Sequence, residues 1–304
     1  MGIFLGIDGG GSRTSCVIGD ETSLLGSGTA GPSNVVRVGE KQARESISSA
    51  VRQACTTANV SPAQIQRTCA GVAGGARPET AAMVRRLVSE LVPSEIEVVG
   101  DMVIALQAAW GGDPGVVVIA GTGSIAYGRN FSGLTARAGG WGFAISDEGS
   151  GHWIGRAAVA AAMRAYDEGH STRLLDGIMS AWVVGTPEQM ILAANSVPPP
   201  DFAALMGVVL SAADAEDPTA LAILSKAGAE LAALAKIVIT RFFAKDLAPV
   251  AMCGGVFRNS ALIRQVFYNT LRSEFPDAFI KQEIVDPVNG ALELARRGRP
   301  AAGS

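Results

Sequence analysis

The chain has 304 residues, of which 48% are hydrophobic and 17% charged, with 37 glycines and a formal net charge of −3 at pH 7. This length allows two units that each bury a core, and the composition is typical of a compact α/β enzyme rather than a disordered or fibrous chain. The slight acidic excess argues against a nucleic-acid binder, and no uninterrupted apolar run reaches the roughly 20 residues that a membrane span needs.

The first part of the chain starts with strands and continues with alternating helices and strands. Strands are predicted at residues 3–7, 14–18, 24–29, 67–72 and 96–99, and helices at residues 40–58, 78–91 and 102–110. Three consecutive strands followed by this alternation favour a mixed sheet with helices on its faces.

The second part opens in the same way and then becomes helical. Strands are predicted at residues 116–119, 125–127, 134–138, 250–252 and 278–284, and helical segments at residues 148–243, 255–271 and 289–297. The expected domains are an N-terminal lobe of residues 1–114 and a C-terminal lobe of residues 115–304 with a helical insertion, its last helix being a candidate to pack back on the first lobe. The basic tail around Arg296 is expected to be the solvated end of that helix.

A glycine-rich turn occurs twice, at an offset of 112 residues. The two copies read Asp8-Gly9-Gly10-Gly11-Ser12 and Ala120-Gly121-Thr122-Gly123-Ser124. Each copy separates two apolar runs, and turns without Cβ atoms bring backbone N–H groups close to an anion, so the pair favours a polyphosphate held between two lobes. Ordinary β-hairpins are the alternative. Neither copy has the lysine of the phosphate loop or opens directly into a helix like the dinucleotide fingerprint.

Two aspartates follow predicted strands. Asp8 ends the first strand beside the first glycine turn, where a carboxylate would repel phosphates unless a cation lay between them, so it is a candidate Mg²⁺ partner; hydrogen bonding to its own turn is the alternative. Asp101 follows the strand at 96–99 and is a candidate general base or, more simply, the N-cap of the next helix.

The segment 138–151 combines glycines, an aromatic ring and acids. Trp141 offers a flat face of the kind on which sugars pack, and Asp147 is able to accept hydrogen bonds from hydroxyl groups. The alternative places Trp141 in the core and lets Asp147 or Glu148 cap the following helix.

The four cysteines have no Cys-x-x-Cys spacing, which indicates buried thiols in a reducing cytoplasmic compartment rather than a disulfide framework. The two histidines, His152 and His170, are too few for a histidine-based metal site.

With these motifs in this order, the chain resembles the N-acetylglucosamine kinase family, in the BadF-type branch of the actin-like ATPase and sugar-kinase superfamily. The resemblance runs from Gly6 to about Arg296. It implies an α/β fold of two ribonuclease-H-like (actin-like ATPase) lobes with an interlobe cleft, ATP and Mg²⁺ as cofactors, and transfer of the γ-phosphoryl group to the primary hydroxyl of an amino sugar. A homodimer is also expected, from the resemblance and the low charged fraction.

The resemblance also assigns roles to individual positions. Asp101 resembles the catalytic base. The positions that match sugar contacts are Asn34, Asp101, Ser124, Gly140, Trp141, Gly142 and Asp147. Ser12 and Thr122 match the two phosphate turns, Gly254 matches the nucleotide turn, and Arg258 is an adenosine-side candidate. The other residues of these turns are nucleotide-binding candidates with them: Gly9, Gly10, Gly11, Thr14, Gly121, Gly123 and Gly255.

Two departures from the family pattern leave the acceptor open. Ile125 stands where the mammalian pattern has an asparagine, and a serine near Ala73 is absent. Glucosamine, N-acetylglucosamine, N-acetylmuramic acid and other hexosamines therefore remain candidates. Two other functions also stay open at this point: an ATPase that activates a radical dehydratase or reductase through an iron–sulfur cluster, which needs cysteine ligands, and a non-enzymatic sugar sensor.

Overall fold

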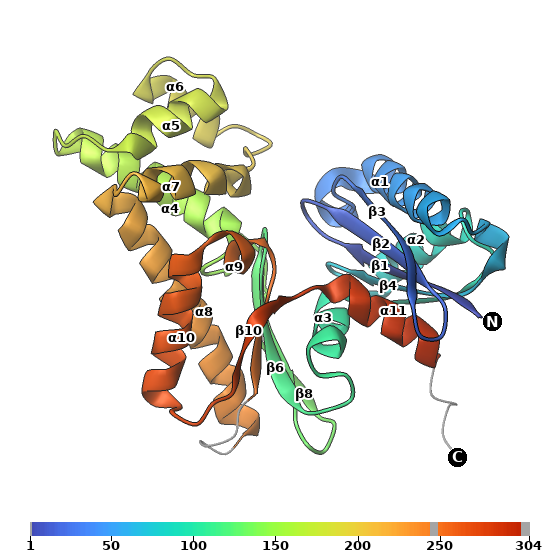
Figure 1. The fold of residues 1–304 in the computed structure, drawn as a ribbon. Helices are drawn as coiled ribbons and strands as arrows, with labels where there is room; N and C mark the ends of the chain where they lie inside the picture. Colours follow the sequence, from blue (N-terminus) through green and yellow to red (C-terminus); the bar gives the residue numbers. More distant parts are fainter. Residues whose placement is uncertain (1, 244–248, 299–304) are drawn as a thin grey trace. The chain divides into compact units, whose positions relative to one another are not determined.

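The computed structural model of the chain describes residues 2–243 and 249–298. It divides into two compact units, the first combining Met1–Val117 with Val285–Ser304 and the second comprising Val118–Ile284 (Figure 1). Each unit is built on a five-stranded sheet. Among the described residues, no helix combines the length and the apolar character that a membrane crossing requires.

The first sheet is mixed, as its pattern predicts. Its strands are β1 (Ile3–Gly9), β2 (Thr14–Gly19), β3 (Leu24–Ala30), β4 (Ile65–Val72) and β5 (Glu95–Gly100). They lie in the order β3-β2-β1-β4-β5, with β1–β2 and β2–β3 antiparallel and β1–β4 and β4–β5 parallel. The carboxyl ends of β1, β4 and β5 therefore meet at one edge of the sheet.

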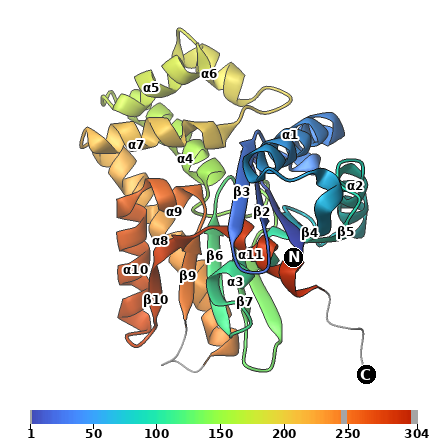
Figure 2. The ribbon, with the colours of Figure 1, turned by 45° about the vertical axis from the view of Figure 1, so that its right-hand side comes forward.

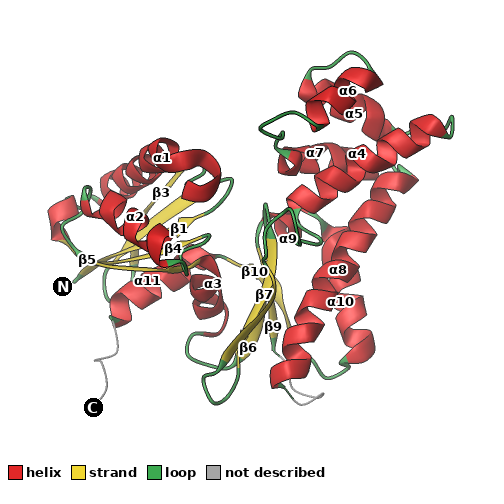
Figure 3. Ribbon diagram, turned by 180° about the vertical axis from the view of Figure 1, so that it is seen from behind, coloured by secondary structure: helices red, strands yellow, loops and turns green. Residues whose placement is uncertain are grey.

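Helices cover both faces of this sheet (Figure 3). They are α1 (Val35–Ala58), α2 (Pro78–Ser89), α3 (Asp101–Trp110) and α11 (Pro287–Arg297), with a short 3₁₀ turn, η1, at Pro62–Gln64. Because successive strand side chains point to opposite faces, Leu5 and Ile7 join the core under α1 and α2, whereas Phe4 joins the core with α3 and α11. Gly6 lets α11 lie close to β1, since a Cβ there would stand 2.5 Å from the backbone nitrogen of Leu292.

Helix α1 begins at Val35, before the predicted start at Glu40. The side-chain oxygen of Asn34 accepts a hydrogen bond from the N–H of Val36 at 3.1 Å and caps the helix. Gly39, with φ +75°, interrupts the first turns. This interruption hides the short N-terminal segment from a search for helical periodicity.

The expectation for Arg296 is wrong, because its side chain is bonded rather than solvated. Its guanidinium donates to the carbonyl of Asp20 at 2.6 Å and to that of Ser23 at 2.8 Å, at the β2–β3 turn. Arg67 in turn donates to the carbonyl of Arg296 at 2.7 Å. These bonds fasten the end of α11 to the first sheet, and Arg299 of the same cluster lies outside the described residues.

The second sheet repeats the plan of the first. Its strands are β6 (Gly115–Ala120), β7 (Ser124–Arg129), β8 (Thr135–Gly139), β9 (Val250–Cys253) and β10 (Ile280–Val285). The order β10-β9-β6-β7-β8, read in reverse, matches that of the first sheet strand for strand. The duplication inferred from the two glycine turns therefore extends to the architecture, and each turn joins the first and second strands of its sheet.

The predicted helical region of the second unit consists of several separate helices. They are α4 (Gly151–Asp167), α5 (Arg173–Trp182), α6 (Pro187–Ala194), η2 (Phe202–Leu205), α7 (Met206–Asp214) and α8 (Pro218–Phe242). The helix predicted at 255–271 is two, α9 (Gly255–Asn259) and α10 (Ala261–Glu274), because Ser260 leaves the helical conformation and caps α10 with its hydroxyl. Helices α8 and α10 pack side by side (Figure 2).

Asp217 ties the starts of α5 and α8 together. Its carboxylate accepts hydrogen bonds from the Thr172 hydroxyl and the Arg173 N–H, each at 2.8 Å, and from the N–H groups of Thr219 and Ala220 at 2.9 and 3.1 Å. Burial raises the pKa of this carboxyl, but the four hydrogen bonds prevail and leave it lowered. The ionised form therefore stabilises the fold.

Asp217→Ala is expected to lower the free energy of unfolding by about 2–3 kcal/mol near pH 7, because it removes a helix cap and charge-assisted hydrogen bonds. A carboxyl whose pKa is lowered on folding stabilises above its unfolded pKa and loses this effect as pH falls through the folded pKa. The difference between the two proteins should thus shrink in acid. Urea unfolding at several pH values measures it, with the exposed Asp214→Asn as control; equal stability near pH 7 would refute the role of this cap.

Candidate active site

Two candidate acids of the first unit lie at one edge of its sheet. Asp8 stands near the end of β1 in register with Gly71 of β4, and Asp101 follows Gly100, the last residue of β5. In an open α/β sheet this edge, beyond the carboxyl ends of parallel strands, is where ligands bind. The arrangement brings Asp8 and Asp101 to the same end of three neighbouring strands.

The first glycine turn is held from both sides by backbone hydrogen bonds. The Gly10 N–H donates to the Arg13 carbonyl at 2.9 Å, and the Gly10 carbonyl accepts from the N–H groups of Ser33 and Asn34 at 3.1 and 3.2 Å. The Gly9 carbonyl accepts from the N–H of Ala73 at 3.2 Å. Ser12 is exposed at the tip of this fixed turn.

Thr14, expected at the phosphates, has its side chain buried instead. Its hydroxyl donates to the Gly31 carbonyl at 2.7 Å and lies 2.7 Å from the Ser33 hydroxyl oxygen. The side chain therefore braces the turn from inside the protein. Asn34, on the same connection, uses its carbonyl oxygen to cap α1, and within the described residues its amide nitrogen makes no hydrogen bond.

Asp101 is the first residue of α3 and not its N-cap. Gly100 occupies the cap position and supplies no side chain. The Asp101 carboxylate accepts the N–H of its neighbour Met102 at 3.0 Å. Burial raises the pKa of Asp101 above its ordinary value, against the opposing effects of the Met102 N–H and of its own backbone N–H. A desolvated carboxylate with spare acceptor capacity is suited to proton transfer.

The second glycine turn lies against the start of α4. The Gly121 N–H donates to the Gly123 carbonyl at 2.9 Å, while the carbonyls of Gly121 and Thr122 accept from the N–H groups of Gly151 and His152 at 2.8 and 3.2 Å. No atom lies within 4 Å of the position that a Cβ on Gly121 would take. The turn therefore has a fixed backbone and an open face.

Ser124 and Asp147 bond to their own loop. Asp147 accepts the N–H of Ser124 at 3.3 Å, and the Ser124 hydroxyl donates to the carbonyl of Glu148 at 2.7 Å. Both residues are buried, with exposed fractions of 3% and 7%. Burial raises the pKa of Asp147, the Ser124 N–H opposes this, and the charge of Glu148 adds to it. In this structure the two polar groups hold the loop in place.

The loop that starts at Gly140 presents Trp141 to solvent. The Trp141 side chain is 61% exposed, so the interpretation of this residue as a core tryptophan is wrong. Gly140 and Gly142 have φ of +69° and +96°, a region that glycine reaches without strain. The Arg137 guanidinium lies 3.9 Å from the centre of the indole ring and leaves the other ring face uncovered by this contact.

Arg137 is a residue that sequence reasoning missed. It lies on β8, and its position four residues before Trp141 gives no signal, because the contact depends on the path of two intervening glycines.

The third glycine position adjoins the second turn. Gly254 follows β9 with φ of +103°, and a Cβ on it would stand 2.3 Å from the carbonyl oxygen of Ala120, at the end of β6. Gly255 opens α9, and Arg258 on the same helix is exposed. Gly254 is therefore required by the close approach of two strand ends.

The cysteines do not form a cluster site. All four are buried, and burial raises the pKa of Cys55 and Cys16 and raises that of Cys69 to about 12. No group of three or more His, Cys, Asp or Glu side chains suited to a metal occurs in the described ranges. Buried, protonated thiols do not provide the thiolate ligands that an iron–sulfur activator needs.

Two sheets of the same strand order, each with a glycine turn after its first strand, define a duplicated α/β protein of the nucleotide-phosphate-binding class. Comparison with known proteins supports this class. The chain is 32% identical to the N-acetylmuramic acid/N-acetylglucosamine kinase of Clostridium acetobutylicum, over 97% of this chain and 99% of that protein. It is 29% identical to the N-acetyl-D-glucosamine kinase of Dictyostelium discoideum, over 96% and 97%.

A solved structure from Chromobacterium violaceum, whose proposed activity is that of an N-acetylglucosamine kinase, superposes with a TM-score of 0.79 at 27% identity, covering 97% of this chain and 99% of the other. Residues 5–295 match the BadF/BadG/BcrA/BcrD ATPase family, and the chain belongs to that family. The α/β fold of two ribonuclease-H-like units implied by the sequence resemblance is thereby confirmed.

Proposed function

We propose that this chain is an ATP-dependent amino-sugar kinase that phosphorylates the primary hydroxyl of N-acetylglucosamine, glucosamine or both. The observation that carries the proposal is Asp101, a carboxylate that follows the carboxyl end of β5 and the N-cap residue Gly100, and whose pKa is raised by burial. The two named relatives at 32% and 29% identity support the substrate class.

Asp101 acts as the general base. It accepts a hydrogen bond from the sugar hydroxyl, orients that oxygen toward the γ-phosphorus and takes its proton as the new O–P bond forms and the bond to ADP breaks. Because phosphoryl transfer needs positioning and charge stabilisation more than covalent catalysis, the remaining residues serve to hold the reactants.

The glycine turns hold the phosphates. Gly9, Gly10, Gly11 and Ser12 act from the first unit, and Gly121, Thr122 and Gly123 from the second, through backbone N–H groups and the two hydroxyls. Thr14 supports the first turn from inside, and Gly254, Gly255 and Arg258 act on the nucleoside side.

Asp8 fits a magnesium partner. It provides a half-buried carboxylate beside the first glycine turn, and the described chain offers no cluster of three or more ligands. Mg²⁺ characteristically binds through one or two carboxylates, phosphate oxygens and water, which matches a single acid at a phosphate turn. When bound, the ion neutralises charge that develops on the phosphate oxygens.

The sugar is held by Trp141 and Asn34. The uncovered face of Trp141 packs on the ring or its acetyl group, and the Asn34 amide nitrogen donates to a ring hydroxyl. Gly140 and Gly142 set the path of the loop, while Ser124 and Asp147 contribute by fixing it, with Asp147 also facing the second turn at Gly123.

An acceptor panel in a coupled ADP-release assay tests the proposal. Turnover with N-acetylglucosamine or glucosamine that far exceeds the rate with ATP alone is expected. ADP release that is unaffected by any hexosamine would refute the kinase assignment.

Ile125→Asn is expected to sharpen the choice between the two sugars. Ile125 packs beneath Gly140 of the loop, where a Cβ would meet its side chain at 2.8 Å, so an amide there stands next to the proposed sugar contacts. A site rejects the wrong sugar strongly when binding it leaves a polar side chain without a hydrogen-bond partner. With isoleucine at position 125 no such group is present there, so discrimination between the two sugars is weaker. The ratio of kcat/KM for N-acetylglucosamine and glucosamine should stay below about a thousandfold in the wild type and rise by about tenfold in the variant. A larger wild-type preference would contradict broad acceptance.

We further propose a cytoplasmic homodimer. The buried free thiols favour a reducing compartment, and the low charged fraction favours association. Light scattering at micromolar concentration should give twice the 31.2 kDa chain mass, and a single-chain mass would refute the dimer. Recovery of the native chain outside the cytoplasm after cell fractionation would contradict the location.

A further inference from the structure

Helix α3, which begins with Asp101, contacts the first sheet through the side chain of Ile104. Ile104 is fully buried, and a Cβ on Gly71 of β4 would stand 2.3 Å from its Cδ1 and 2.5 and 2.7 Å from its two Cγ atoms. Three atoms of a stiff, β-branched side chain thus occupy the space that a side chain on β4 would need. Because positions three apart lie on the same face of a helix, Asp101 stands one turn before this contact.

Gly71 is also the neighbour of Asp8 in the sheet. The two residues are in register across the parallel pair β1–β4. Paired residues of adjacent strands lie about 4.8 Å apart and belong to the same face of the sheet. This is the face of α3 and α11, because Phe4, four residues before Asp8, and Cys69, two residues before Gly71, both join the core there. The contact of Ile104 with β4 therefore lies beside Asp8.

A second glycine faces the backbone of Ile104. It is Gly290 of α11, where a Cβ would stand 2.0 Å from the Ile104 carbonyl oxygen. Three residues further along α3, the Gln107 amide donates a hydrogen bond to the Glu293 carboxylate at 2.9 Å, and the Gln107 side chain is buried. Helix α3 is thus fixed against both β4 and α11, in each case where a glycine leaves room for Ile104.

We propose that Gly71 is a positioning residue for phosphoryl transfer. Its missing side chain lets Ile104 pack directly on β4, and the depth of this contact sets the distance between the carboxylates of Asp101 and Asp8. A general base works only within hydrogen-bond distance of the proton that it takes, and a displacement of about 1 Å costs about 10²-fold in rate. This inference rests on the proposed amino-sugar kinase activity and adds to it a residue that touches neither substrate.

Gly71→Ala is expected to lower kcat by about 100-fold and to change KM for ATP and for N-acetylglucosamine by less than about threefold. The added Cβ displaces Ile104, and α3 with it, by about 1 Å before ordinary van der Waals contact is reached. The first glycine turn and Asn34, which are proposed to hold the reactants, lie outside α3. The coupled ADP-release assay measures kcat and KM, and circular dichroism verifies that the variant is folded.

Ile104→Ala removes all three crowding atoms and reverses the expected effect of the same change at Gly71. In Ile104→Ala, α3 lacks the side chain that sets its depth, so kcat should fall. Adding Gly71→Ala to that variant replaces part of the lost contact, so kcat should rise by about tenfold. The added methyl group stands beside Asp8 in both backgrounds, so a direct effect on magnesium or ATP would have the same sign in both.

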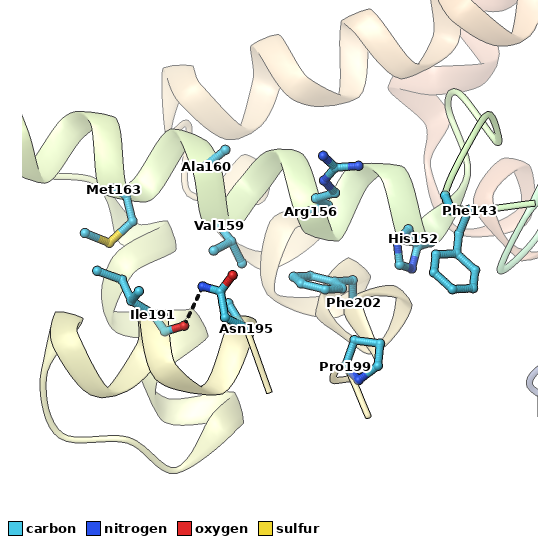
Figure 4. Close-up of a pocket in the computed structure, with 12 residues that line it drawn as sticks. Phe143, His152, Arg156, Val159, Ala160, Met163, Ile191, Asn195, Pro199 and Phe202 are labelled. Atoms are coloured by element: carbon cyan, nitrogen blue, oxygen red, sulfur yellow. Dashed lines mark hydrogen bonds between the residues drawn. The ribbon is translucent and has the colours of Figure 1, made fainter. Parts of the chain in front are cut away.

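Two substitutions control for the added carbon atom. Gly26→Ala is similarly crowded, since its Cβ would stand 2.4 Å from the backbone nitrogen of Ala58, but it presses on the end of α1 instead of α3. Val159→Ile adds its carbon where the structure has room, at a pocket of about 460 Å³ along α4 in the second unit. Figure 4 shows Val159 on the side of α4 that faces Ile191. Both controls should leave kcat unchanged, and Gly26→Ala should lower thermal stability as Gly71→Ala does.

Three results would contradict the positioning role. A folded Gly71→Ala with the kcat of the wild type, or with a loss confined to KM, would overturn it while the kinase activity stands. A double variant no faster than Ile104→Ala would overturn it as well, and this comparison is decisive even if Gly71→Ala alone does not fold. A wild type that phosphorylates no amino sugar would refute the kinase activity and the positioning role together.

Discussion

Asp101→Asn is expected to reduce kcat for phosphoryl transfer by about 10²- to 10⁴-fold while sugar binding is kept. The amide still accepts the Met102 N–H and still meets the sugar hydroxyl, but it has no capacity to take the proton. Single-turnover kinetics isolate the chemical step, and sugar binding is followed separately by tryptophan fluorescence. A variant that keeps more than about a tenth of wild-type turnover in the chemical step would show that Asp101 is not the base.

The pH dependence gives this prediction a second readout. A general base works only when ionised, and burial raises the pKa of Asp101, so the acid limb of kcat should lie at higher pH than an ordinary aspartate would give. The limb should vanish in Asp101→Asn. The same shift means that ionising Asp101 opposes folding once the pH rises above its unfolded pKa, so the variant should be at least as stable as the wild type near neutrality. Glu45→Gln, an exposed change on α1, controls for loss of one charge.

Gly121→Val is expected to lower kcat/KM for ATP by about 100-fold, the scale of losing one backbone donor to a phosphoryl oxygen. Gly121 has no positive φ, and no protein atom stands within 4 Å of its Cβ position, so the fold accommodates the side chain. A phosphate on the open face of the turn is not accommodated together with this side chain, because the valine would occupy its space. Thermal unfolding should therefore be nearly unchanged.

Gly207→Val is the matched control for this substitution. Gly207 lies on α7 and likewise has no atom within 4 Å of its Cβ position. It should leave kcat/KM for ATP unchanged. Equal ATP kinetics in Gly121→Val and the wild type would mean that the second turn is only a hairpin connection.

The sequence predicted the duplicated architecture because short sequence patterns identify the repeat. Each copy places a glycine turn between two apolar strands, and such a pattern survives without knowledge of the rest of the chain. Boundaries were less accurate where a single glycine or serine broke a helix, as at Gly39 and Ser260, because periodicity averages over a window longer than the break.

The sequence predicted that the candidate site residues follow strands and lie in glycine turns, but it did not predict which groups each side chain bonds to. Thr14, Ser124 and Asp147 have the residue types of ligand contacts, yet their polar atoms bond to protein groups up to 24 residues away. Such bonds depend on the tertiary path of the loops and leave no spacing in the sequence. The position of Asp101 as the first helical residue likewise follows from Gly100 taking the cap position. Residue preference alone favours aspartate over glycine as a cap.

The most direct test of the amino-sugar kinase assignment is the identity of the product that the wild-type chain makes from ATP and N-acetylglucosamine. Phosphorus and proton NMR of the reaction mixture determine which oxygen carries the new phosphate, and ADP is measured in the same sample. The account predicts one ADP per phosphorylated sugar, with the phosphate on the primary hydroxyl and coupled to its two neighbouring methylene protons. ADP formed at the same rate without sugar, or a phosphate on another hydroxyl, would contradict it.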